Sequence, residues 1–82
     1  MGGYVYLIKS INYNWRYIGS TKDLKQRFNN HNLGKVKSIK YYRPFLLLYY
    51  EAYPNYSLAR KREIELKRHG QQKEILFQRL GI

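Results

Sequence analysis

The amino-acid sequence predicts an α+β domain in which helices pack against a small sheet. Two observations favour this fold class: runs of β-forming residues alternate with segments whose apolar residues recur at helical spacing, and capping or helix-breaking residues separate them. The expected strands cover residues 4–9, 15–19 and 44–53, and the expected helices cover residues 23–33, 57–70 and 74–80. The resulting order is β-β-α-β-α-α, and at 82 residues we expect one domain over residues 1–82.

The first two strands are expected to form a β-hairpin. The stretch YVYLIKSINYNWRYIGS, residues 4–20, holds two runs of β-forming residues around an asparagine-containing loop. If Tyr6 lies opposite Tyr17, one face of the hairpin is aromatic and the other is aliphatic. That register pairs Tyr4 with Gly19 and Ile8 with Trp15, and it leaves on the other face Val5, Leu7 and Ile18. We expect the aliphatic face to join the core and the aromatic face to serve another purpose.

The first expected helix brings an arginine and a histidine together. Its N-cap candidates are Ser20, Thr21 and Asp23. Arg27 and His31 are four residues apart, so their Cβ atoms are expected about 5–6 Å apart on one helix face. A guanidinium beside an imidazole is a poor structural pair but a useful pair around a phosphate. An ordinary surface histidine is the alternative interpretation of His31.

The third strand and the last two helices follow from apolar runs and breakers. Residues 44–53, PFLLLYYEAY, are interpreted as a buried central strand, because a continuous apolar run with aromatic ends fits such a strand better than a helix. Pro54 and Asn55 end it. Ser57 can cap the second helix, which ends at Gly70, and the last helix is short.

The charge balance predicts a polyanionic partner. Sixteen Lys and Arg residues against five Asp and Glu residues give a net charge of +11. Nucleic acid is favoured over acidic membrane or protein surfaces, because the basic residues are scattered among aromatic residues rather than gathered in one amphipathic helix. The stretch that best combines both features consists of Lys35, Lys37, Lys40, Tyr41, Tyr42 and Arg43. We expect it to bind phosphates and stack on unpaired bases, and a solvated loop is the alternative.

The composition also bears on the compartment. No cysteine is present, which excludes disulfides and thiol catalysis and indicates a reducing environment. The longest apolar run, residues 44–50, is too short to cross a bilayer, and the N-terminus lacks the pattern of a secretory signal. We therefore expect a cytoplasmic protein without membrane association, as a monomer or a weak homodimer. The residues point to no particular protein partner.

One of the five carboxylates is a candidate metal ligand. The carboxylates are Asp23, Glu51, Glu63, Glu65 and Glu74. Phosphodiester chemistry usually needs a divalent cation held by oxygen ligands. The residues spaced at i, i+4, i+7 and i+11 are Ala59, Glu63, Leu66 and Gly70. This spacing places Glu63 at the edge of an inward-facing stripe, either as a metal ligand facing the sheet or as the partner of Lys67 in a salt bridge.

The order and spacing of these residues resemble the GIY-YIG nuclease domain, in particular its short stand-alone members. The matching residues are Tyr4-Val5-Tyr6, Tyr17-Ile18-Gly19, Arg27, His31 and Glu63, and the resemblance covers residues 3–77. It implies a three-stranded antiparallel sheet flanked by helices and metal-dependent hydrolysis of phosphodiester bonds in DNA. The sequence departs from the family pattern in having YVY instead of GIY, Ser20 where some relatives have lysine, and no asparagine after Asn55.

The resemblance also implies a role for each matching residue. Tyr6 and Tyr17 would be the active-site phenols, Arg27 would bind phosphate, His31 would be the helix histidine, and Glu63 would hold Mg²⁺ or Mn²⁺. We expect Tyr17 to act as a base only where nearby cations favour its phenolate. Tyr6 would orient a water or Tyr17, and His31 would relay a proton.

The expected function is endonucleolytic cleavage of DNA in DNA repair or processing. It would be structure-directed or weakly sequence-specific, because base readout needs an element committed to a groove. RNA stays open as a second substrate. One alternative is a non-catalytic nucleic-acid-binding module of the same fold, and another is a basic scaffold subunit whose tyrosines bind a protein. Metal-dependent nicking and salt-sensitive affinity for DNA separate these three functions.

Overall fold

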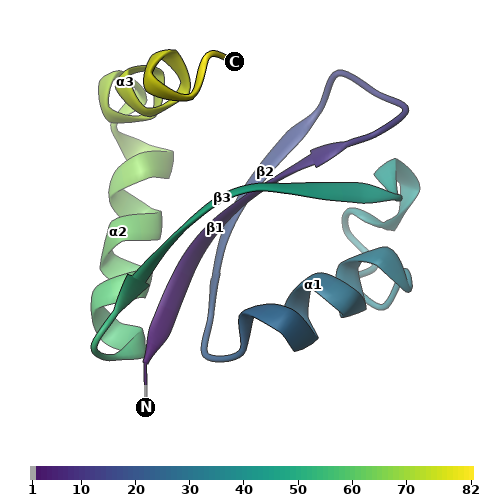
Figure 1. Cartoon of the computed structure of the whole chain (residues 1–82), viewed down its shortest axis with the longest axis horizontal. Coiled ribbons are helices and arrows are strands. Elements are labelled where there is room, and N and C mark those ends of the chain that lie inside the picture. The colour runs from purple at the N-terminus through teal and green to yellow at the C-terminus, as the bar shows by residue number, and fades with distance from the viewer. Residues whose placement is uncertain (1) are drawn as a thin grey trace.

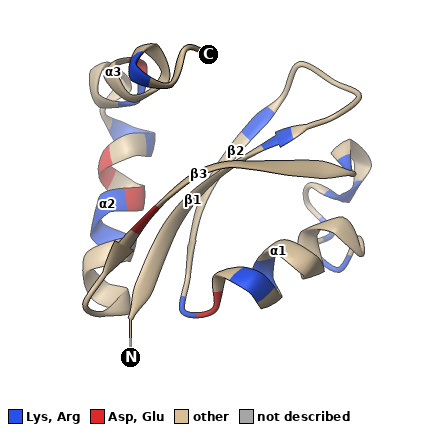
Figure 2. Cartoon of the chain, viewed as in Figure 1, with Lys and Arg blue, Asp and Glu red and all other residues tan. Residues whose placement is uncertain are grey.

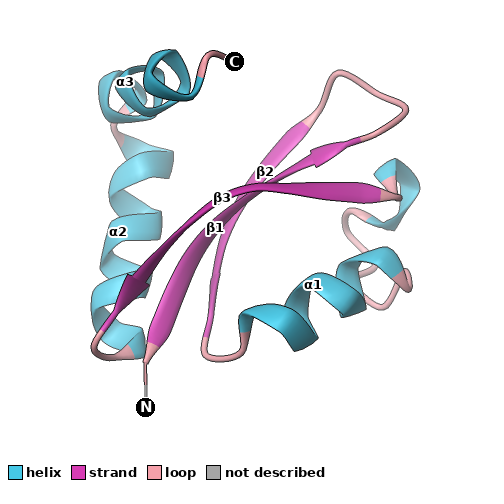
Figure 3. Cartoon of the chain, in the orientation of Figure 1, coloured by secondary structure: helices cyan, strands magenta, loops and turns pink. Residues whose placement is uncertain are grey.

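The computed structural model describes residues 2–82 and contains a three-stranded antiparallel sheet with helices on both sides (Figure 1). The elements, in chain order, are β1 (Gly3–Ser10), β2 (Arg16–Thr21), α1 (Leu24–Asn32), the 3₁₀ helix η1 (Lys40–Tyr42), β3 (Phe45–Tyr53), α2 (Tyr56–Arg68) and α3 (Gly70–Leu80). The predicted fold class and order β-β-α-β-α-α are confirmed (Figure 3). Each helix within residues 2–82 is too short or too polar to span a bilayer.

Each face of the sheet is covered by its own apolar cluster. The first cluster lies under α2 and α3 and contains Val5, Leu7, Ile18, Ala59, Leu66 and Leu76. The second lies between the sheet, α1 and η1, and its buried members are Tyr6, Ile8, Ile39 and Phe45. The predicted separation of an aliphatic face from an aromatic face is confirmed. The aromatic face is itself largely a core, however, because α1 and the segment after it cover most of it.

The predicted register of the hairpin is wrong by two residues. Tyr6 pairs with Gly19, and Tyr17 pairs with Ile8. A hydrogen bond from the Ser10 backbone N–H to the Trp15 carbonyl, at 2.9 Å, brings Ser10 next to Trp15 and so fixes β2 two residues along β1 from its predicted position. Since side chains alternate with a period of two, this shift keeps each of them on its predicted face.

The predicted central position of residues 44–53 is also wrong. β1 is the central strand because it pairs with both neighbours in the order β2-β1-β3, which leaves β3 at an edge. The apolar run of β3 has another cause: Phe45 enters the second cluster, while Tyr49 packs against the first. Leu46 and Tyr50 stay 51% and 53% exposed.

One of the two predicted helix caps is replaced by a neighbour. Asp23 caps α1, because its side chain accepts a hydrogen bond at 3.0 Å from a backbone N–H of the first turn. Asn55 caps α2 in the same way at 3.0 Å, so the prediction of Ser57 as this cap is wrong. α2 ends at Arg68, and α3 already begins at Gly70, so the last helix is longer than predicted.

Candidate active site

A buried hydrogen bond joins β1 to α1 at the centre of the predicted site. The Tyr6 hydroxyl lies 2.7 Å from His31 Nε2, and both side chains are buried. Burial raises the pKa of Tyr6 to about 12 and lowers the pKa of His31 to about 4. Both groups are therefore uncharged at neutral pH. The alternative interpretation of His31 as a surface histidine is wrong, because the second apolar cluster encloses it.

Arg27 lies one helical turn before His31 and next to the same phenol. The neighbouring Tyr6 phenol raises the pKa of Arg27, and the guanidinium in turn partly opposes the effect of burial on the pKa of Tyr6. The i, i+4 spacing on α1 places Arg27 and His31 on one helix face, as predicted, and the structure shows that both lie next to the Tyr6 phenol. Arg27 is half-buried, so its charge can meet a ligand, whereas His31 cannot.

Tyr17 stands at the rim of this buried pair. Its ring centroid lies 6.4 Å from that of Tyr6 and 5.7 Å from that of His31. Its side chain is half-buried, and Lys67 Nζ from α2 lies 4.8 Å from the centre of the ring. The site therefore holds one enclosed phenol and one accessible phenol, and the accessible phenol has a cation beside it.

Gly19 is required by packing rather than by its backbone conformation. Its φ is not in the positive region. A Cβ at this position would lie 2.5 Å from Tyr6 Oη and 2.9 Å from Tyr17 Cε2. Both phenols therefore lie directly against the backbone of β2.

Gly19→Ala is expected to destabilise the fold by about 1–3 kcal/mol, because the added methyl group forces the Tyr6 ring away from His31. Urea unfolding monitored by circular dichroism measures this change. Gly70→Ala is the matched control, since a Cβ at Gly70 meets no atom within 4 Å. We expect the control to be neutral or slightly stabilising. Equal losses in the two variants would contradict the packing explanation.

His31 is expected to make the fold less stable as the pH falls from 6.5 towards 4. The unfolded chain takes up a proton on this imidazole near its ordinary pKa of 6.5, whereas the folded protein takes it up near pH 4. The stabilisation is thus complete above pH 6.5 and is lost towards pH 4, by about 3 kcal/mol. Urea unfolding at several pH values checks this. His31→Gln should flatten that slope and the exposed-site control His69→Gln should keep it; a slope unchanged in His31→Gln would refute the assignment.

Glu63 of α2 lies buried beside the first apolar cluster, as its helical spacing predicts. Its Oε1 accepts a hydrogen bond from Ser20 Oγ and lies 2.9 Å from Arg60 Nη1, while its Oε2 lies 2.8 Å from Lys67 Nζ. Burial acts to raise the pKa of Glu63, but the hydrogen bonds from these three side chains outweigh burial and hold the pKa below its usual value. Glu63 is therefore ionised at neutral pH, and the salt bridge to Lys67 is present.

The donor set around Glu63 fits a hard divalent cation with few protein ligands. Within residues 2–82, no three His, Cys, Asp or Glu side chains gather in a group that could hold a metal ion. Mg²⁺ keeps several waters and binds through one or two carboxylates, so one ionised carboxylate is compatible with it. Arg60 and Lys67 have side chains that are 52% and 43% exposed, which lets them swing away from the carboxylate.

The predicted nucleic-acid-binding stretch lies on the surface and connects to Tyr17 through stacked rings. Its exposed members are Lys35, Lys37, Lys40, Tyr41 and Arg43. Tyr42 is half-buried and stacks on Trp15 with a centroid distance of 4.2 Å and an interplanar angle of 6°. Trp15 lies parallel to Tyr17 at 6.1 Å. A row of aromatic rings therefore runs from the accessible phenol to the basic surface.

Three side chains of this site were not assigned by sequence reasoning: Ser20, Lys67 and Trp15. Ser20 meets Glu63 across 43 positions of the chain, so no local pattern indicates that contact. Lys67 lies four residues after Glu63 on one helix, which is a signal for the salt bridge but not for the contact with Tyr17. Trp15 stands two residues before Tyr17, and this alternation could have indicated the stacked row.

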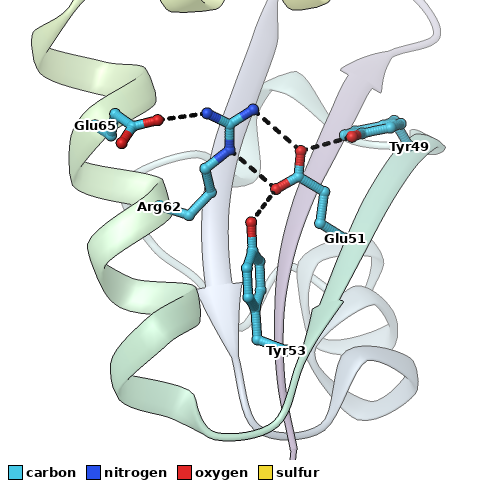
Figure 4. Close-up of polar contacts among 5 residues, drawn as sticks. All are labelled: Tyr49, Glu51, Tyr53, Arg62 and Glu65. Carbon is cyan, nitrogen blue, oxygen red and sulfur yellow. Dashed lines mark hydrogen bonds and ion pairs between the residues drawn. The ribbon is translucent and has the colours of Figure 1, made fainter.

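Glu51 and Glu65 belong to a separate network that holds α2 against β3. Glu51 accepts hydrogen bonds from the hydroxyls of Tyr49 and Tyr53, each at 2.6 Å, and lies 3.0 Å from Arg62 Nε (Figure 4). Arg62 also pairs with Glu65 at 2.6 Å. Burial acts to raise the pKa of Glu51, but Arg62 and the two phenols hold it below its usual value. The network fixes the helix that carries the candidate metal ligand.

Comparisons with known proteins agree with this architecture. A family model described as the GIY-YIG catalytic domain matches residues 2–75. A UPF0213 protein of Staphylococcus haemolyticus is 37% identical over 73 residues, and one of Staphylococcus aureus is 38% identical over 73 residues, with 88% of each chain covered in both cases. The solution NMR structure of a UPF0213 protein from Bacillus halodurans is 30% identical, with a TM-score of 0.54 over 93% of this chain and 83% of that chain. The chain therefore belongs to the GIY-YIG family, as the spacing of its tyrosines, Arg27, His31 and Glu63 implied.

Proposed function

We propose that this protein is a metal-dependent endonuclease that hydrolyses phosphodiester bonds in DNA. The observation that carries the proposal is that one lysine contacts both a buried, ionised carboxylate and an accessible phenol. Lys67 Nζ lies 2.8 Å from Glu63 Oε2 and 4.8 Å from the centre of the Tyr17 ring. Membership of a family named for its catalytic domain supports a nuclease.

The guanidinium of Arg27 supplies a positive charge to this site, and the carboxylate of Glu63 supplies a negative charge. Bound at Glu63, Mg²⁺ or Mn²⁺ would supply Lewis-acid stabilisation of the scissile phosphate. Arg27 binds the nonbridging phosphoryl oxygens, because its planar fork matches two of them and its half-buried position strengthens the interaction. Ser20 holds one oxygen of Glu63 and so fixes the orientation of the carboxylate.

The two phenols have different tasks because their burial differs. Tyr17 is half-buried and reaches solvent, so its phenolate form can accept a proton from the attacking water, and the ammonium of Lys67 lies 4.8 Å from the centre of its ring. Tyr6 is enclosed, and its raised pKa keeps it protonated, so it orients its neighbours and does not act as the base. His31 acts through Tyr6, which it contacts directly, and is a positioning residue.

The surface suits DNA of irregular structure better than a particular base sequence. The basic stretch and the row of rings from Tyr17 to Tyr42 offer phosphate contacts and stacking surfaces, both of which tolerate any base. We propose structure-directed or weakly specific cleavage, in DNA repair or processing in the cytoplasm, with RNA as a second candidate substrate. The net charge of +11 opposes strong self-association, which favours a monomer or a weak homodimer.

A non-catalytic nucleic-acid-binding module is the second candidate function. The observation that favours it is the occupation of Glu63 by two cations, Arg60 at 2.9 Å and Lys67 at 2.8 Å, which already neutralise the carboxylate. In such a module the carboxylate would only hold α2 to the strand that carries Ser20.

Cleavage of end-labelled single-stranded, nicked and branched DNA by the purified protein tests the proposal. Reactions contain Mg²⁺ or Mn²⁺, and parallel reactions contain EDTA. We expect cleavage of at least one substrate with metal and none with EDTA. Salt-sensitive binding without cleavage of any substrate would favour the binding module, and the absence of salt-sensitive affinity would favour a protein scaffold.

The double variant Lys37→Met, Lys40→Met is expected to lower the slope of log Kd against log salt concentration by about 1.4 for single-stranded DNA, because two phosphate contacts are lost and each contributes about 0.7. Fluorescence anisotropy at several salt concentrations measures the slope. The Mg²⁺ concentration that gives half-maximal cleavage should stay unchanged, since both lysines are on the exposed stretch and not beside Glu63. An unchanged slope would mean that the stretch is a solvated loop.

A further inference from the structure

A cationic pocket lies beside the candidate active site, between β2 and the C-terminal helices. It has a volume of about 360 Å³ and is lined by Arg16, Tyr17, Ile18, Lys67, Lys73 and Phe77. Three of these six side chains are cations, and no carboxylate of the described residues lines the pocket. Figure 2 shows Lys and Arg residues on β2, α2 and α3, the elements that border it. Its chemistry suits an anion.

Arg16 places an unpaired hydrogen-bond donor in the wall of this pocket. Its guanidinium carbon lies 5.3 Å from the centre of the Phe77 ring, which holds the planar group against α3. Its Nε is buried and has no hydrogen-bond partner. Buried N–H donors are almost always paired. The Arg16 Nε–H group is therefore free to donate a hydrogen bond to an anion that binds in the pocket.

The pocket is continuous with the candidate active site through two shared residues. Tyr17 contacts the buried pair of Tyr6 and His31 on one side and lines the pocket on the other. Lys67 pairs with Glu63 and also lines the pocket. A strand whose scissile phosphate lies at Arg27 and Glu63 would therefore pass Tyr17 and place a neighbouring phosphate near Arg16.

We propose that this pocket binds a phosphodiester that flanks the scissile phosphate of the nucleic-acid strand. This inference rests on the proposed nuclease function and extends its substrate contacts to Arg16 and Lys73. The planar guanidinium donates hydrogen bonds to the phosphate oxygens, and Lys73 adds a point charge from α3. α3 thus forms one wall of the substrate path.

Arginine Nε–H signals in ¹H–¹⁵N NMR spectra test the proposal directly, without metal and so without cleavage. The probes are a thymidine dinucleotide with one internal phosphodiester, the same dinucleotide with a 5′-phosphate, and inorganic phosphate. We expect the unphosphorylated dinucleotide to shift the Arg16 Nε–H signal saturably. Lys73→Met should weaken this binding about tenfold, whereas Lys61→Met, which removes an exposed charge from the other side of α2, should not.

The remaining outcomes separate this inference from the proposed function. A shift at Arg27 without one at Arg16 would overturn the pocket and leave the nuclease proposal standing. A shift of the Arg16 signal with inorganic phosphate, or only with the 5′-phosphorylated dinucleotide, would mean that the pocket binds a terminal phosphate at a strand end. This outcome would also overturn the proposal. No shift at either arginine would count against both. Arg16→Lys, which keeps the charge and loses Nε, should bind the dinucleotide about tenfold more weakly than the wild type.

Discussion

Glu63→Gln is expected to lower metal-dependent cleavage by about 1,000-fold while leaving single-stranded DNA binding intact. The carboxylate is the ionised group that suits a divalent cation at this site, and a metal-bound phosphate gains several kcal/mol of stabilisation in the transition state. Glutamine keeps the shape of the side chain and the hydrogen bond from Ser20, so the fold should persist. Single-turnover cleavage of a labelled oligonucleotide measures the rate.

Glu74→Gln is the matched control for this variant. Glu74 is an exposed carboxylate on α3. Its removal changes the net charge by the same amount, so we expect cleavage to stay within about a factor of two of the wild type. Cleavage by Glu63→Gln above a tenth of the wild-type rate would rule out Glu63 as the metal ligand.

Arg27→Ala is expected to reduce turnover by about 100- to 1,000-fold, with DNA affinity changed by no more than about threefold. In the proposed mechanism Arg27 stabilises charge that grows on the phosphoryl oxygens in the transition state, whereas many other cations of this +11 chain would contribute to binding. Cleavage rates and anisotropy titrations on the same oligonucleotide separate the two effects. Arg27→Lys should recover little activity, because lysine lacks the planar fork.

Arg68→Ala supplies the comparison for Arg27, since it removes an exposed arginine from the end of α2. We expect it to weaken binding slightly and leave turnover of the bound substrate unchanged. Equal losses of affinity and turnover in Arg27→Ala would instead make Arg27 a phosphate anchor without a role in the transition state.

The sequence alone sufficed for the features that depend on local periodicity. Alternation in the hairpin placed Val5, Leu7 and Ile18 on one face, and helical spacing placed Glu63 on the buried side of α2. The register and the edge position of β3 depend on which strands meet in space. A loop closed at Ser10 and the central position of β1 decide them, and neither leaves a periodic signal.

The candidate site was predictable where residues lie four apart or match the family motif. Arg27 and His31 reach one phenol through helical spacing, and the resemblance supplied both tyrosines. The burial of His31 was not predictable, because the cluster that encloses it includes Ile39 and Phe45 from later in the chain. The contacts of Ser20 and Arg16 likewise depend on helices that lie far along the sequence.

The order of elements along the chain also matters while the protein is being made. Both phenols, Arg27 and His31 leave the ribosome before β3, whereas Glu63 follows on α2. A growing chain that has reached the end of β3 thus contains all three strands, both tyrosines, Arg27 and His31 but lacks the carboxylate. The carboxylate that completes the candidate site is therefore added only after the whole sheet and α1 have been made.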